Sequence, residues 1–212
     1  MNKTIKTKTK ESDKNIEVTI LNAARTIFLK KGYDGARMQE IADEAGINKA
    51  LLHYYFRSKD KLFAAIFDEA FHQFLPRIAG YFQADIPLFE KIEKITGLYI
   101  SMLKQNPYIP MFILHEVQNN PDLIVDKLQN QGGIDPQLIN KQIQKEVKDG
   151  TIRPVDFRQV MVSVISMCIF PFAAKPMLIK LLFNNDENAW DIFIEERKKF
   201  IPELIKESLK AR

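Results

Sequence analysis

The side chains best suited to bind another molecule lie in residues 38–56, MQEIADEAGINKALLHYYF. Met38 and Ile41 begin an apolar ladder with the three- and four-residue steps of one helix face. Gly46 is expected to end that helix, because glycine enters a left-handed turn without steric cost, and Asn48 can cap a second helix. The spacing therefore predicts a helix-turn-helix, a motif whose second helix reads the DNA major groove.

The outer face of the second predicted helix combines basic, aromatic and small apolar side chains. Lys49 at its start can reach guanine edges or phosphate, whereas Ala50 and Leu51 match thymine methyl groups. Three side chains are expected to touch phosphates, which position a protein without specifying a sequence: Arg37, Tyr54 and Lys59. The predicted DNA-binding residues are Arg37, Asn48, Lys49, Ala50, Leu51, His53, Tyr54 and Lys59. A plain helical hairpin whose outer face meets only water stays open as the alternative.

The positive charge of the chain is concentrated around this motif. Of 31 basic and 27 acidic residues, residues 1–62 hold 13 and 8, so they carry a formal charge of +5 and the remainder carries −1. A phosphate-binding module joined to a neutral second domain has this distribution. Residues 1–14, polar and rich in lysine, are predicted to form a disordered basic arm that either follows DNA or is simply solvated.

The order of short motifs in residues 32–62 resembles the tetracycline-repressor (TetR) family of bacterial regulators. The family pattern is a glycine-aromatic pair, an I-A-x-x-A-G-hydrophobic run, an aromatic Y-x-Y-F cluster and S-K-x-x-L. This sequence supplies Gly32-Tyr33, Ile41-Ala42, Ala45-Gly46-Ile47, Tyr54-Tyr55-Phe56 and Ser58-Lys59 with Leu62. The likeness covers about residues 15–74, with two departures: Arg37 stands where the family often has threonine, and His53 where it usually has tyrosine.

The resemblance implies an all-α protein with an N-terminal three-helix DNA-binding domain, residues 15–74, and a C-terminal helical domain, residues 85–212, that binds an effector and dimerises. It implies a homodimeric repressor that leaves a palindromic double-stranded DNA operator when a small apolar molecule binds. In the family the last two helices pair with their symmetry mates. The candidates at or beneath that interface are Trp190, Phe193 and Phe200. Two alternatives remain: an architectural DNA-binding protein without an effector, and a helical carrier or enzyme for an apolar metabolite.

The second domain carries a mixed set of apolar and polar-aromatic side chains. Any one of them more simply fills a core, since methionines and aromatic rings usually do. Together they would suit an apolar ligand with one or two polar handles, and the family resemblance, rather than their spacing, implies such a site. The predicted ligand-binding residues are Tyr99, Met102, Tyr108, Met111, Phe112, His115 and Met167. A long helix expected from Ser58 to about Phe74 would link this site to the DNA-binding domain.

No catalytic, metal or cofactor motif is found in the sequence. Glycine-rich phosphate loops and nucleophile motifs are absent, and His53, His72 and His115 lack the spacing of metal ligands. The single cysteine, Cys168, lies in an apolar stripe, which predicts a buried inert thiol in a reducing cytoplasm. The amino terminus lacks the apolar core of a signal peptide, and the apolar residues 160–174 include serines. A cytoplasmic protein with no membrane partner, no cofactor and no enzymatic activity is therefore expected.

Overall fold

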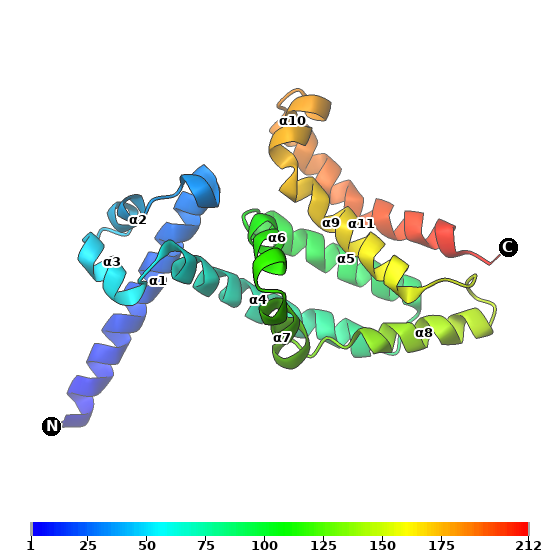
Figure 1. Cartoon of the computed structure of the whole chain (residues 1–212), viewed down its shortest axis with the longest axis horizontal. Helices are drawn as coiled ribbons and strands as arrows, with labels where there is room; N and C mark the ends of the chain where they lie inside the picture. Colours follow the sequence, from blue (N-terminus) through cyan, green and yellow to red (C-terminus); the bar gives the residue numbers. More distant parts are fainter. Residues whose placement is uncertain (1, 212) are drawn as a thin grey trace. The chain divides into compact units, whose positions relative to one another are not determined.

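The computed structural model describes the backbone of residues 2–211 and the side chains of residues 15–130 and 132–211. Within these residues the chain forms helices and no strand element, which confirms the all-α prediction (Figure 1). It divides into two compact units, Met1–Phe71 and His72–Arg212. The elements are α1 (Asn2–Gly35), α2 (Met38–Glu44), α3 (Lys49–Tyr55), α4 (Lys59–Gln83), α5 (Leu88–Gln105), α6 (Ile109–Asn119), α7 (Pro121–Asp126), the π-helical turn η1 (Lys127–Gln131), α8 (Pro136–Lys148), α9 (Phe157–Ala173), α10 (Lys175–Phe183) and α11 (Glu187–Leu209).

Helix α1 is longer than the sequence predicts. Its backbone is helical from Asn2, so residues 2–14 continue the helix instead of forming the predicted disordered arm. The physical reason is that no glycine or proline interrupts residues 2–31, and a nucleated helix extends at the cost of fixing one residue at a time. At Gly32 the regular helix is interrupted, because this residue has φ 70° and the helix is kinked there.

The core of unit 1 is built from the inward faces of α1 to α4. Ile20, Ala24 and Phe28 of α1 are 0%, 0% and 1% exposed. Phe28 packs edge-on against Phe63 of α4, with ring centroids 4.7 Å apart. The four-residue spacing of the buried α1 residues is the amphipathic stripe expected from the sequence, and it holds the two short helices of the motif in place.

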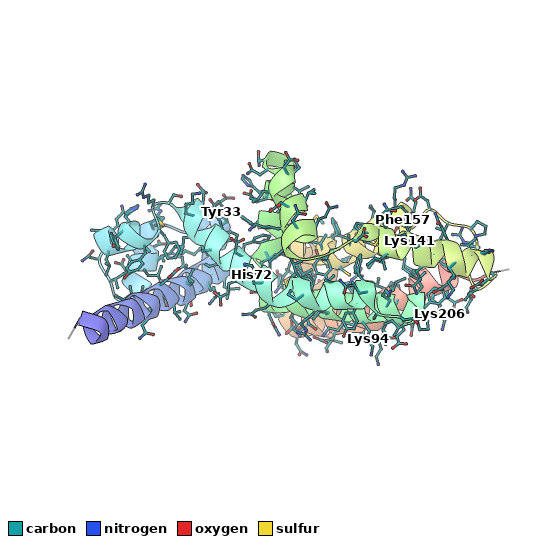
Figure 2. The ribbon with its side chains drawn as sticks, turned by 90° about the horizontal axis from the view of Figure 1, so that it is seen from below. Tyr33, His72, Lys94, Lys141, Phe157 and Lys206 are labelled. Carbon is teal, nitrogen blue, oxygen red and sulfur yellow. The ribbon has the colours of Figure 1, made fainter. Side chains whose placement is uncertain are left out.

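In unit 2, α5 lies along α11, and α9 packs against both of them (Figure 1). Their inward faces are apolar, with Ile100, Leu103, Ile194 and Ile201 at most 1% exposed. Helix α8 contacts α5 and α9, and Figure 2 labels Lys141 on α8 and Phe157 at the start of α9. The unit therefore has a continuous apolar core between the long helices.

A proline inside α9 leaves a carbonyl without its helical donor. Pro171 has no N–H, so the carbonyl of Met167 four residues earlier cannot make its helical hydrogen bond. Arg197 of α11 replaces that donor, with Nη2 2.7 Å from the Met167 oxygen. After this segment the axes of α9 and α10 differ by 79°. No single helix among the described residues is long and apolar enough to span a membrane, and this bent pair meets the criterion only by combined length and composition.

A buried lysine of α5 and two polar residues of α8 hold the turn between α4 and α5. Lys91 is 3% exposed and its Nζ donates to the carbonyl oxygen of Phe82 at 3.1 Å. Gln142 of α8 donates to the Ile86 oxygen at 2.8 Å, and Glu146 accepts from the Leu88 N–H at 3.0 Å. Burial lowers the pKa of Lys91, while nearby carboxylates oppose that shift. This polar joint fixes the turn where α5 begins.

Candidate nucleic-acid interface

The helix-turn-helix forms through the turn and cap that the sequence predicts. Gly46 adopts φ 68°, and the Asn48 side-chain oxygen accepts a hydrogen bond from the Leu51 N–H at 2.8 Å. Leu52 is 0% exposed and Phe56 is 8% exposed, so the inner face of α3 packs against the rest of unit 1. Because one face is fixed and the capped first turn is rigid, α3 presents its opposite face in a defined orientation.

The opposite face of α3 is open to solvent. Lys49, Ala50, His53 and Tyr54 are all exposed, and Tyr54 keeps 79% of its surface accessible. Leu51 is half-buried, so part of its side chain packs and part remains available. This face can bind DNA in two ways. The lysine, imidazole and phenol groups can donate hydrogen bonds to base edges and phosphates, and the apolar side chains can contact thymine methyl groups.

Two of the predicted DNA-contact residues, Asn48 and Lys59, already make hydrogen bonds within the protein. Asn48 uses its side-chain oxygen for the cap, which leaves the amide donor for another molecule. The Lys59 ammonium donates to the carbonyl oxygens of Tyr33 at 2.7 Å and Ala36 at 3.3 Å, and lies 4.3 Å from the centroid of the Tyr33 ring. Lys59 therefore braces the turn between α1 and α2, and one of its three donors is left for a phosphate.

The start of α2 carries an exposed cation. Arg37 is exposed and its side chain makes no capping bond there. Lys31 instead donates to Glu40 at 2.9 Å, and this hydrogen bond holds the pKa of the Glu40 carboxyl below its usual range. Sequence reasoning missed one further exposed cation, Arg57, which follows α3 and whose carbonyl lies 3.3 Å from His53 Nδ1. Its position just after the aromatic cluster of the motif could have marked Arg57 as a candidate for DNA contact.

The structure places the predicted ligand-binding residues in different environments. Met102 and Tyr108 are 6% and 8% exposed, and the Tyr108 hydroxyl donates to Asn106 at 3.0 Å. Met111 and His115, one helical turn apart on α6, face solvent. Those half-buried are Tyr99, Phe112 and Met167. The structure thus gathers part of the set inside unit 2 and leaves the outer face of α6 apart from it, and the site stays a prediction.

One buried and one half-buried polar side chain of unit 2 were missed. Thr96 occupies the middle of the apolar stripe formed by Ile92 and Ile100, and it is 0% exposed. Arg197 is half-buried on α11. The sequence could have revealed Thr96, because it is a polar residue at a core position of an otherwise apolar stripe. It could not have revealed Arg197, whose inward direction depends on the proline in α9.

Comparisons with known proteins agree with this geometry. Residues 20–66 match the model of "Bacterial regulatory proteins, tetR family". The regulator RutR of Escherichia coli K12 is 28% identical over 139 residues, which are 65% of this chain and 64% of RutR, so the chain spans slightly less than two thirds of this relative.

Two solved structures share the fold. FadR of Bacillus subtilis, in complex with stearoyl-CoA, has a TM-score of 0.60 at 16% identity, with 88% of this chain and 96% of FadR covered. AibR, in complex with isovaleryl coenzyme A and operator DNA, has a TM-score of 0.59 at 21% identity, with 74% and 86% covered. The ordered motifs and the helix-turn-helix geometry agree with the family match, so residues 20–66 form a helix-turn-helix domain of the tetR-family type.

Proposed function

We propose that this protein is a ligand-responsive transcriptional repressor that binds a DNA operator as a homodimer and is released by a small, largely apolar effector. The observation that carries the proposal is the contrast between the two faces of α3. Leu52 on the inner face is fully buried, while Lys49 and Tyr54 on the outer face are exposed. A helix fixed in this way fits the major groove of B-DNA.

Within that function the exposed residues take separate roles. Lys49 reaches a guanine edge or a phosphate at the start of α3, and Leu51 with Ala50 contacts thymine methyl groups. Arg37 and Tyr54 contact phosphates, which fix the register of α3 on the duplex. The basic excess of residues 1–62 supports this assignment, because phosphate contacts supply much of the affinity of such proteins.

The proposed dimer uses the apolar surface of α9, α10 and α11. Large hydrophobic side chains on these helices are 46% to 70% exposed: Val162, Ile165, Phe170, Met177, Leu181, Leu182, Ile192, Phe200 and Leu204. Apolar surface of this extent on adjacent helices is typical of a protein interface. Trp190 is 2% exposed and lies beneath that surface, where it packs edge-on against Phe183 with ring centroids 5.5 Å apart.

The effector would bind in unit 2 among the half-buried residues Tyr99, Phe112 and Met167. Helix α4 is continuous along the chain from Lys59 in unit 1 to Gln83 in unit 2, so a ligand-dependent change in unit 2 can reach the DNA-binding unit through it. AibR binds isovaleryl coenzyme A and FadR binds stearoyl-CoA in their structures, which supports an effector with an apolar acyl part.

The proposal can be tested by comparing the operator affinity of wild type with that of a variant changed on the exposed face of α3. Fluorescence anisotropy would measure binding to DNA from upstream of the protein's own gene and to random DNA of equal length, for wild type and Lys49→Ala. Lys94→Ala, an exposed lysine on α5, is the charge-matched control. We expect specific binding that Lys49→Ala weakens and Lys94→Ala leaves unchanged. Equal affinity for both DNAs would indicate an architectural protein, and no DNA binding would favour a carrier.

A further inference from the structure

Three helices of unit 2 bring together hydrogen-bond donors that lack acceptors. Thr96 of α5 is fully buried, and its Oγ1 finds no partner among the described residues except the weak one offered by the Cys168 thiol. The Nε of Arg197 on α11 is also buried without a partner there. Since nearly all buried polar atoms in native proteins are hydrogen-bonded, two such atoms in one region indicate a partner that is not part of the chain.

The Cys168 thiol on α9 connects these groups in space. Burial raises the pKa of Cys168 to about 12, and both the Arg197 charge and a hydrogen bond with Thr96 act against that rise. Tyr99 lies one turn beyond Thr96 on α5, and burial, with a smaller contribution from Cys168, raises the pKa of its hydroxyl. Arg197 is bonded to the Met167 oxygen, the residue before Cys168, and α5, which carries Thr96 and Tyr99, packs against both α9 and α11. These three side chains therefore come from helices that meet near one thiol, and each has a donor.

Among the described residues, none pairs with the charge of Arg197. Its Nη2 donates to the Met167 oxygen at 2.7 Å, and its guanidinium carbon lies 5.3 Å from the centroid of the Phe193 ring. These contacts fix the side chain, but no carboxylate lies within 4.0 Å of it in the described part of the chain. Burial lowers the pKa of Arg197, which is the expected result of desolvating a cation without an anionic partner.

We propose that Arg197, Thr96 and Tyr99 form an acid-binding subsite that receives the carboxylate group of a mostly apolar effector. A carboxylate is an acceptor-only group with two oxygens, so it can take a charge-assisted bond from Arg197 and neutral bonds from the two hydroxyls. The ring of Phe74, 5.6 Å from that of Tyr99, and the ring of Phe193 supply apolar surface beside the polar groups. The subsite rests on the proposed function, because it makes unit 2 the effector-binding part.

The test compares carboxylates with their uncharged analogues on the full-length protein without DNA. Isothermal titration would measure binding of unbranched carboxylates from butanoate to palmitate and of the alcohols of equal length. The variants are Thr96→Val, which replaces the hydroxyl by a methyl group of similar size, and Arg197→Met. Arg158→Met is the control, because Arg158 is exposed on the same bundle and pairs with Asp156 at 2.6 Å.

We expect wild type to bind at least one carboxylate about tenfold or more tightly than its alcohol, and Thr96→Val and Arg197→Met each to lose about tenfold of that affinity. Thr96→Val should also leave the melting temperature of the ligand-free protein unchanged or raised, because it removes a poorly satisfied buried hydroxyl. A lowered melting temperature together with unchanged carboxylate affinity would show that Thr96 is a structural residue. Equal affinity of wild type for every carboxylate and its alcohol would overturn the subsite.

Failure of the subsite and failure of the proposed function give different results. If carboxylates bind with the expected preference and the protein binds no DNA, the repressor proposal fails and the subsite stands. If the protein binds its operator and an uncharged molecule releases it while no carboxylate binds, the subsite alone fails. Should Arg197→Met be unfolded by circular dichroism, because it also loses the bond to Met167, Thr96→Val still decides the question.

Discussion

Asn48→Asp should separate the folding role of this residue from its role at DNA. An aspartate oxygen can accept the same hydrogen bond that the Asn48 side chain takes from the Leu51 N–H at 2.8 Å. Asparagine and aspartate are equally good caps, and a negative charge at a helix amino terminus adds about 0.3–1 kcal/mol. The free energy of unfolding should therefore stay the same or rise slightly. Operator affinity should fall, because the new charge would lie beside phosphates.

The size of the loss at DNA follows from Coulomb's law. A new negative charge about 4 Å from a phosphate costs on the order of 1 kcal/mol in high dielectric, or about fivefold in affinity, and more where water is excluded. Asn48→Ala is the matched variant, because it removes the cap without adding charge and should cost about 1 kcal/mol of stability. That loss lowers the melting temperature of a chain of this size by about 2–4 °C.

Thermal unfolding and fluorescence anisotropy on the same samples would measure both effects, at two salt concentrations because phosphate repulsion is screened. If Asn48→Asp is destabilised as much as Asn48→Ala, the cap assignment is wrong. If Asn48→Asp binds operator as tightly as wild type at low salt, the amino terminus of α3 does not face DNA.

Three further predictions concern specificity, packing and pH. Leu51→Ala should relax the preference for one thymine step by roughly 1–3 kcal/mol in competition assays, and an equal loss on random DNA would show that Leu51 only packs. Gly132→Ala should lower the free energy of unfolding by about 1–3 kcal/mol, because its Cβ would lie 2.8 Å from the Leu128 oxygen and from Leu75 Cδ1. Gly97→Ala, with nothing within 4 Å, should instead raise it by up to about 1 kcal/mol, and like effects of the two in urea titrations would refute the packing account. The unfolded Cys168 thiol loses its proton near its ordinary pKa of 9.0 and the folded one near 12, so stability should fall between these pH values. Cys168→Ala should make that fall shallower in thermal unfolding at pH 8 to 11, and an unchanged slope would contradict the burial of this thiol.

Local signals in the sequence predicted the helix boundaries well. Three aspartates at helix starts, Asp135, Asp156 and Asp186, each cap a helix by accepting a backbone N–H from one of the next three residues. Gly46 and Asn48 likewise form the turn and cap of the helix-turn-helix. These features depend only on a side chain and its neighbours in sequence, which is why they can be read without a structure.

Features that depend on distant contacts could not be predicted in this way. The inward position of Arg197 follows from the Met167 carbonyl that Pro171 leaves free, a contact across 30 residues. The exposure of Met111 and His115 depends on which face of α6 packs, and an almost wholly apolar segment does not specify that face. Composition also predicted disorder for residues 1–14, of which residues 2–14 have a helical backbone.

DNase footprinting of the region upstream of the protein's own gene tests the central proposal most directly. A dimer that uses α3 for recognition should protect two half-sites whose centres lie about 34–36 Å apart, or a multiple of that distance, on one face of the duplex. Protection should disappear in Lys49→Ala, and an effector should remove it from wild type. Uniform protection without discrete half-sites, or a discrete footprint that Lys49→Ala leaves intact, would contradict the assignment of α3 as the recognition helix.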